Sequence, residues 1–334
     1  MKPYIIYGYE LSYFTRKMER AFSWHGFAYQ RKSKTLNEKW RLERRSGTHQ
    51  VPVVETPQGW YLADTTPISL WLDSQDSGRA LLPPGPGAVL VRLIEEYFDE
   101  WTARLALHYR WNDKQSAKNA SRRLAKEMAP WAPAFVQDKL GAKIADWGRR
   151  AVRALGLDSA AQQAVGEEEL RRVYEALEQQ LSHTRFALGD RPTIVDAVIL
   201  GGLDAHFAVD RVCSEMLEAF PRIRQWQKDA GKWDGEGDFP IFPETTPFGD
   251  FILKEMSGNY QRFIEGNAQA LSQEQKAFKV EIGGSEVSYL ARRYPDKSRL
   301  MISEFIDRCL NSEEKASVQT WLGQKGLEAV LDSK

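Results

Sequence analysis

The chain has 334 residues, of which 42% are hydrophobic and 28% are charged. This length exceeds what one hydrophobic core usually supports, so we expect a globular protein of two domains with a further segment. The 46 basic and 46 acidic residues balance, which excludes an overall basic field that would recruit nucleic acid or anionic lipid. We therefore expect small-molecule or protein partners and no nucleic acid.

Cysteine and histidine usage argues against disulfides and metal ions. Cys213 and Cys309 are far apart in the sequence, which suits a reducing compartment. The five histidines show no metal-ligand spacing. No apolar run approaches the roughly 18 residues of a membrane span. We therefore expect a cytoplasmic protein that holds no metal and does not contact a membrane.

Residues 1–80 have the pattern of a small α/β unit, which we predict as the first domain. Short apolar runs alternate with helical spacing and end at glycine or proline turns. In chain order we expect strand, helix, strand, helix, strand, strand and helix over residues 3–7, 14–25, 27–31, 36–45, 51–55, 60–62 and 66–74. This order is βαβ followed by ββα.

Beyond residue 80 the pattern becomes helical. Prolines and glycines at residues 82–87 cannot sustain a helix or a central strand, so we predict a linker over residues 81–88. Apolar residues at helical spacing over 89–109 and 168–181 predict long helices. We therefore assign residues 89–240 to an all-helical second domain.

Residues 241–334 form a predicted C-terminal extension. Alternating residues on both sides of Gly283 and Gly284 predict a two-residue hairpin. Two amphipathic helices follow, the second capped near Asn311. Their apolar faces must be buried on this chain or on a partner, and we expect this tail to dock on its own chain. The fold class is therefore α/β plus all-α, with an α+β tail.

Two short stretches of the first domain suit ligand recognition. Pro52 heads a strand where it cannot donate to the ladder. A cis bond would turn the backbone of Val51 toward a peptide-like ligand, and a trans proline on an edge strand is the alternative. Asp64 and Thr65 precede a helix, where they could cap it or recognise the charged groups of an amino acid.

Together these stretches resemble the glutathione transferase family. Five motifs occur in the order and at the intervals of that family's thioredoxin-like half: Tyr7-Gly8, residues 12–18, residues 51–54, residues 64–68 and Leu81-Leu82-Pro83. In the helical half, Thr193 and Asp196 resemble the capping box before the family's central helix. The resemblance covers about residues 2–230 and implies a glutathione site on the first domain. It also implies a homodimer.

The resemblance implies a role for each residue of the glutathione site. Val51, before Pro52, would pair its backbone with the cysteinyl part of glutathione. Asp64 and Thr65 would hold the γ-glutamyl end, where the family more often has Glu-Ser. Gln50 would reach the glycyl carboxylate, with His49 or Arg16 as less specific candidates.

Ser12 stands where serine-type members donate a hydrogen bond to the glutathione sulfur, and the alternative is that it only caps the first helix. Tyr13 replaces the usual proline, and Tyr7, Tyr9 and Tyr13 are alternative donors. The loop has no cysteine, which disfavours a mixed disulfide.

The long helix at 89–109 and the residues just after it would line the site for a hydrophobic electrophile, with a pocket made of Tyr97, Trp101, Leu105, His108 and Tyr109. We expect an enzyme in which the glutathione thiolate attacks a small hydrophobic electrophile. The alternative is a non-catalytic relative that binds ligands or proteins, and a glutathione-dependent reductase or isomerase is a third possibility. Ordinary aromatic residues do not identify the electrophile.

Overall fold

The computed structural model describes residues 2–75 and 77–331. The chain forms two compact units, each assembled from three separate stretches of sequence. Unit 1 contains residues 1–81, 106–150 and 192–236, and unit 2 contains residues 82–105, 151–191 and 237–334. The predicted boundaries at residues 80, 88 and 240 stay a prediction.

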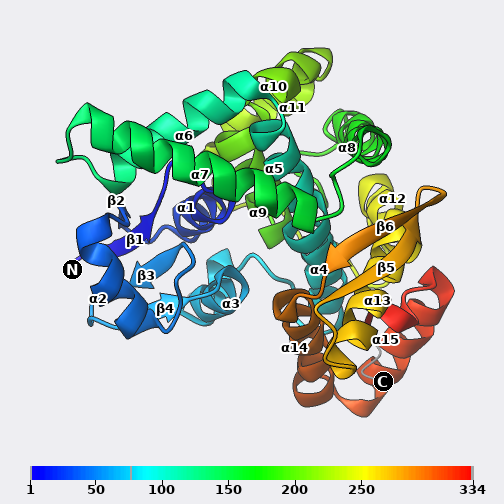
Figure 1. Ribbon diagram of the computed structural model, residues 1–334. Helices are drawn as coiled ribbons and strands as arrows, with labels where there is room; N and C mark the ends of the chain where they lie inside the picture. The colour runs from blue at the N-terminus through cyan, green and yellow to red at the C-terminus, as the bar shows by residue number, and fades with distance from the viewer. Residues whose placement is uncertain (1, 76, 332–334) are drawn as a thin grey trace. The chain divides into compact units, whose positions relative to one another are not determined.

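Unit 1 begins with a four-stranded mixed sheet in the order β2-β1-β3-β4 (Figure 1). Its elements in chain order are β1 (Tyr4–Gly8), α1 (Tyr13–His25), β2 (Tyr29–Ser33), α2 (Leu36–Ser46), β3 (Val53–Glu55), β4 (Tyr61–Ala63) and α3 (Thr65–Gln75). β1 is parallel to β2 and antiparallel to β3, which is antiparallel to β4. The predicted thioredoxin-like order is confirmed, although β2 starts two residues later than expected.

Alternation along β1 places helices on both faces of this sheet. Tyr4 packs against Phe22 of α1 and Trp71 of α3. Tyr7 points to the other face and packs with Leu42 of α2. Because successive strand side chains point to opposite faces, α1 and α3 cover one face and α2 the other.

Helices complete unit 1. They are α5 (Ala103–Trp111) from residue 106, α6 (Lys114–Met128), α7 (Ala134–Ala154) up to residue 150, α9 (Ile194–Gly202), α10 (Arg211–Met216) and α11 (Pro221–Asp229). α9 is buried along its whole length and packs directly on α1. A π-helical segment, Leu203–Phe207, extends it.

The predicted capping box is present at the start of α9. The carboxylate of Asp196 accepts the backbone N–H of Thr193 at 2.7 Å and its hydroxyl at 3.0 Å. Both side chains are fully buried. The box therefore satisfies donors that would otherwise be buried without a partner.

Unit 2 consists of helices and one hairpin. Its elements are α4 (Pro86–Glu96), α8 (Ala160–Gln180), α12 (Pro247–Glu255), α13 (Gln261–Ser272), β5 (Ala277–Ile282), β6 (Ser285–Leu290), α14 (Arg293–Cys309), α15 (Ser312–Lys325) and α16 (Glu328–Leu331). The π-helical segment Tyr97–Thr102 joins α4 to α5, so the expected helix at 89–109 is interrupted. The predicted hairpin turns at Gly283 and Gly284, which both have positive φ.

The C-terminal extension packs on helices of its own unit, as expected. α14 and α15 contact α4, and α12 contacts α8. Glu96, at the end of α4, is buried beneath this extension. Its carboxylate accepts the hydroxyl of Tyr260 at 2.7 Å and the hydroxyl of Ser298. Burial raises the pKa of Glu96 to about 7.

Asp196→Ala removes the carboxylate of the capping box and leaves the N–H of Thr193 buried without its acceptor. We expect the free energy of unfolding to fall by about 2–3 kcal/mol, measured by urea denaturation. Asp138→Ala, at an exposed position on α7, is the control and should change it by less than about 0.5 kcal/mol. Equal effects of the two substitutions would contradict the structural role of the box.

Glu96→Gln should flatten the pH dependence of stability. Between its ordinary pKa of 4.5 and the folded-state value of about 7, the unfolded chain releases the Glu96 proton and the folded chain retains it. Stability therefore falls as the pH rises through this window, by about 3 kcal/mol in the parent.

Urea denaturation below pH 4.5 and above pH 7 measures this difference. Relative to the parent, the variant should gain stability at the higher pH. Glu304→Gln, at an exposed position on α14, should behave like the parent. A Glu96→Gln variant with the parent's pH profile would show that Glu96 is ionised in the folded protein.

Candidate functional site

Three segments that carry predicted site residues meet at one end of the sheet in unit 1. Tyr7 of β1 is opposite Val53 of β3, which is opposite Ala63 of β4. The loop that follows β1, the segment that precedes β3 and the residues that follow β4 therefore leave the sheet at the same end. These segments contain Ser12, residues 50–52 and residues 64–65, so the register brings the predicted glutathione residues into one neighbourhood.

Ser12 is the N-cap of α1. Its backbone is extended, and its hydroxyl oxygen accepts the N–H of Thr15 at 3.3 Å. Its own N–H donates to the carbonyl of Tyr9 at 3.1 Å, which closes a tight turn. A capping hydroxyl uses an oxygen lone pair and keeps its proton. Capping and donation to a ligand are therefore compatible at Ser12.

The three alternative phenols are differently placed. Tyr7 donates its hydroxyl to Glu55 at 2.9 Å, and Tyr9 donates to the carbonyl of Lys34 at 2.7 Å. Burial raises the pKa of both phenols above the usual value. Tyr13 is buried, with its ring packed against His206 and Phe207. Because a phenol has one proton, Tyr7 and Tyr9 would have to break these bonds to act on a sulfur atom.

The Val51–Pro52 peptide bond is cis, which settles the alternative that the sequence left open. Val51 is partly exposed and lies two residues before the first residue of β3, whereas Pro52 is buried. Gln50 is exposed, and its N–H donates to the hydroxyl of Thr48 at 3.1 Å. A ligand at this end of the sheet would therefore meet Val51 and Gln50 before the buried strand.

Asp64 has a φ of 77° and is partly exposed. Its carbonyl accepts the N–H of Ile68 at 3.2 Å, so Asp64 alone of the two residues expected before this helix occupies the position before α3. Left-handed backbone is costly for most residues other than glycine and is often found at functional sites, although aspartate and asparagine tolerate it better than most. Thr65 follows as the first residue of the helix and is buried.

Lys34 is a residue that sequence reasoning missed. Only 3% of it is exposed, and its ammonium group donates to the carbonyl of His49 at 2.7 Å and to Glu43 at 3.1 Å. Its own carbonyl accepts the Tyr9 hydroxyl. Burial lowers the pKa of Lys34. Lys34 thus connects the loop after β1 to the segment before Gln50, and no local pattern signals this contact.

The predicted electrophile-pocket residues are all buried and fall into two groups. In unit 2, Tyr97 packs against Tyr260, and Trp101 packs against Tyr260, Phe263 and Tyr289 of the tail. Leu105 lies against Gly166 of α8.

In unit 1, His108 accepts from the side chain of Asn112, and Tyr109 packs against Phe207. Assigning these five residues to an electrophile pocket remains a prediction.

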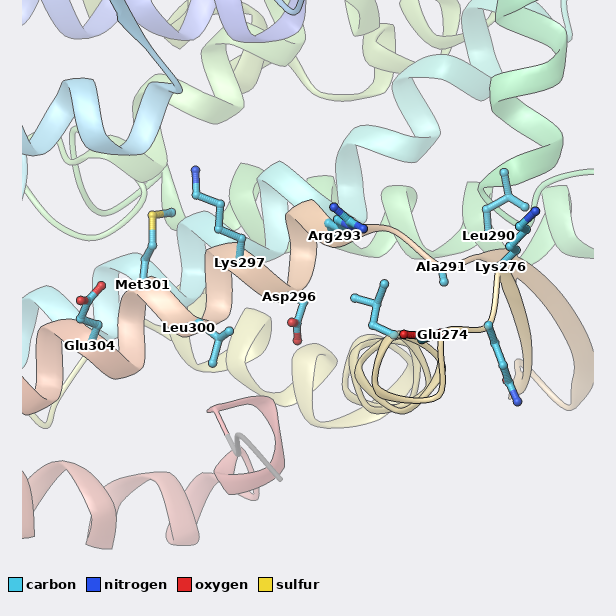
Figure 2. A pocket seen from close by; sticks show the side chains of 12 residues that line it. Glu274, Lys276, Leu290, Ala291, Arg293, Asp296, Lys297, Leu300, Met301 and Glu304 are labelled. Atoms are coloured by element: carbon cyan, nitrogen blue, oxygen red, sulfur yellow. The ribbon is translucent and has the colours of Figure 1, made fainter. Parts of the chain in front are cut away.

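A separate hollow of about 990 Å³ lies in the tail of unit 2 (Figure 2). The end of α13, the flanks of the hairpin and one side of α14 line it, with Leu271, Leu290, Leu300 and Met301 between charged residues. None of its lining residues was predicted as a site residue. Its lysine and glutamate side chains are exposed, so it lacks the buried polar groups typical of a specific site.

Two features are absent from the described residues, a metal-binding cluster and a membrane-spanning helix. Among residues 2–75 and 77–331, no group of three His, Cys, Asp or Glu side chains could hold a metal ion. Over the same residues, no helix is both long and apolar enough to cross a membrane.

Solved structures of similar proteins were found by comparison of folds. A glutathione S-transferase from Rhodospirillum rubrum F11 has 17% identity and a TM-score of 0.47, covering 74% of this chain and 98% of its own. A glutathione S-transferase from Methylobacterium radiotolerans, in complex with glutathione sulfonate, has 18% identity and a TM-score of 0.43, covering 73% and 98%. A maleylacetoacetate isomerase from Anaeromyxobacter dehalogenans 2CP-1 has 22% identity and a TM-score of 0.39, covering 70% and 92%.

Family models match both parts of the architecture. The model "Glutathione S-transferase, N-terminal domain" matches residues 6–80, and "Glutathione S-transferase, C-terminal domain" matches residues 143–229. A search of curated proteins found no match. The two matched domains occur in the family's order, and the first contains the sheet end described above. The chain therefore belongs to the glutathione S-transferase family.

Proposed function

We propose that unit 1 binds glutathione at the end of the sheet where β1, β3 and β4 meet, and that the protein is a glutathione transferase. The observation that carries this proposal is the register of the three strands, which gathers Ser12, Val51 and Asp64 at one end. Two helices, α1 and α3, also begin there. Helix N-termini present unpaired N–H groups and a partial positive charge, which favour a thiolate and carboxylates.

Each segment offers a different kind of contact to the tripeptide. The backbone of Val51, before the cis bond, would pair with the cysteinyl residue. Asp64, at the start of α3, would hold the γ-glutamyl amino group, and Thr65 the adjacent carboxylate. The exposed Gln50 would contact the glycyl end. These groups match a ligand that carries one ammonium and two carboxylates.

Ser12 would donate a hydrogen bond from its hydroxyl to the sulfur atom. A free thiol has a pKa near 8.5, and lowering it by about two units requires roughly 2.7 kcal/mol of preference for the thiolate. One hydrogen bond to a charged acceptor supplies about 1.5–3 kcal/mol, and the N-terminus of α1 adds to it. The thiol proton would leave to solvent, and the thiolate would then attack a small hydrophobic electrophile. As the new carbon–sulfur bond forms, either a leaving group departs with its electron pair, or the π electrons of an activated double bond move to the neighbouring atom, which takes up a proton from water. A cytoplasmic homodimer belongs to the same proposal.

A non-catalytic ligand-binding role is the second candidate, and one observation favours it. Tyr97 and Trp101, predicted to face the electrophile, are covered by tail residues within unit 2. If these two residues are needed for substrate binding, the tail must move. Turnover with no member of a broad electrophile panel, despite glutathione binding, would favour this candidate.

Asp64→Asn should weaken glutathione binding at least about tenfold, because it removes the charge opposite the γ-glutamyl ammonium group. Asparagine tolerates left-handed backbone, so this variant separates charge from strain. Isothermal titration calorimetry of the parent and the variant measures the effect. Asp138→Asn on α7 is the control. A parent that is folded yet does not bind glutathione would refute the proposed function.

Substitutions of Ser12 separate capping from donation to sulfur. Ser12→Thr keeps both functions, Ser12→Asp keeps the cap and loses the donor, and Ser12→Ala loses both. We expect turnover near the parent's for threonine and a fall of about tenfold or more for the other two.

Ultraviolet titration of the bound thiolate should show a raised glutathione pKa in the aspartate and alanine variants. Ser23→Ala, at an exposed position on α1, is the control. Normal turnover of the Ser12→Asp variant would show that Ser12 serves only as a helix cap.

A further inference from the structure

Arg110, in the last turn of α5, reaches the loop that carries Ser12. Its Nη1 donates to the carbonyl of Leu11 at 2.7 Å. Leu11 directly precedes Ser12, so this bond fixes the peptide group that leads into the cap. Arg110 is 2% exposed, and both residues belong to unit 1.

The rest of the Arg110 guanidinium is held by residues that follow α9. Nε donates to the carboxylate of Asp210 at 3.1 Å, and Nη2 lies 3.0 Å from the same carboxylate. Nη2 also donates to the carbonyl of Ala205, and Nη1 lies 3.1 Å from Nε2 of His206. The five N–H donors of arginine thus have five acceptor contacts, so the group has little freedom to move.

His206 adds to this rigidity as a neutral ring. Arginine only donates, so Nε2 of His206 must accept, and Nδ1–H donates to the carbonyl of Ala106 at 3.1 Å. Burial, followed by the charge of Arg110, lowers the pKa of His206 well below its usual range. The ring of Tyr13, the residue after Ser12, packs against this imidazole. The residues before and after Ser12 therefore contact the same cluster, which consists of Arg110, His206 and Asp210.

The remaining residues of the loop are held by separate contacts. The N–H of Glu10 donates to the carboxylate of Glu127 on α6 at 3.1 Å. The Tyr9 hydroxyl donates to Lys34. These contacts fix the start of the loop, and Arg110 alone among these groups contacts the peptide adjacent to Ser12.

A buried ion pair needs an explanation beyond stability. Replacing such a pair by apolar residues of similar volume is often neutral or stabilising, because charges lose solvation when they are buried. Only 2% of Arg110 and 3% of Asp210 are exposed to solvent. An apolar pair could not supply the directional hydrogen bond that Arg110 donates to the carbonyl of Leu11.

We propose that Arg110 is a positioning residue for thiolate activation: through the Leu11 carbonyl it sets the direction of the Ser12 hydroxyl, and Asp210 holds Arg110 in place. This role rests on the proposed function of Ser12. It means that the helical part of unit 1 controls the geometry of a group on the thioredoxin-like part. Small errors in the placement of a reacting group can reduce the rate about 100-fold.

The test uses the double variant Arg110→Met/Asp210→Leu, which removes both charges together and leaves none unpaired. We expect the glutathione dissociation constant to change less than about threefold and kcat to fall about 10- to 100-fold. Ultraviolet titration should show a raised pKa of the bound thiol. Arg110→Lys, which can reach Leu11 or Asp210 but lacks the planar fork, should be intermediate, and it replaces the double variant if that fails to fold.

A matched control is Arg20→Met/Asp204→Leu. This pair joins α1 to the segment after α9 in the same unit, with a 2.7 Å contact and no bond to residues 9–12. Asp204 also lies 3.7 Å from Arg16, so the comparison is made on residues 9–13. It should leave kcat and the thiol pKa near the parent's values. Equal effects of the two double variants would show a merely structural role and overturn the proposal.

Amide hydrogen exchange separates this proposal from the proposed function. Residues 9–13 should exchange faster in the Arg110 double variant than in the control, with the sheet unchanged. If the double variant shows this faster exchange but the parent has no thiol chemistry, the positioning of the loop is retained and the enzyme is refuted. Unchanged exchange of residues 9–13 together with unchanged kcat would refute the positioning role while leaving the enzyme intact.

Discussion

The close contact between α1 and α9 is the constraint on which unit 1 depends. A Cβ at Gly201 would lie 2.6 Å from the backbone N of Lys17, and one at Gly202 would lie 2.6 Å from the ring of Tyr13. Only glycine allows this approach. Since α1 also covers the sheet, α9 fixes the helix whose first turn carries Ser12. The buried capping box at Thr193 and Asp196 fixes the start of α9, one to two turns before this contact.

Much of the fold was predictable because its signals are local. Strand alternation, the helix caps at Thr193 and Asn311 and the Gly283-Gly284 turn each depend on a few neighbouring residues, and each was found where expected. Boundaries shifted by a few residues, since terminal turns depend on tertiary contacts. The cis state of Val51–Pro52 was left open by the sequence, because a strand-leading proline is compatible with both isomers.

The parts of the candidate site that sequence analysis missed depend on long-range contacts. Lys34 reaches a carbonyl 15 positions away, and Arg110 reaches one 99 positions away. Neither residue stands in a motif, and a lysine or arginine on a helix or after a strand is usually solvated. Likewise, nothing in residues 89–109 indicates that Tyr97 and Trp101 pack under Tyr260 and Tyr289. Such contacts follow from the topology, which no local pattern specifies.

The contacts around Ser12 indicate why its hydroxyl and the N-terminus of α1 would stabilise a thiolate there, in preference to Arg110 or the nearby phenols. The charge of Arg110 is compensated by Asp210, and His206 is held neutral. The hydroxyls of Tyr7 and Tyr9 already donate hydrogen bonds to Glu55 and to the carbonyl of Lys34. For a thiolate bound at Ser12, the Ser12 hydroxyl and the partial charge of the first turn of α1 would be stabilising groups. Because each contributes only a few kcal/mol and a hydrogen bond weakens steeply with misalignment, chemistry at this site depends on how precisely the loop is held.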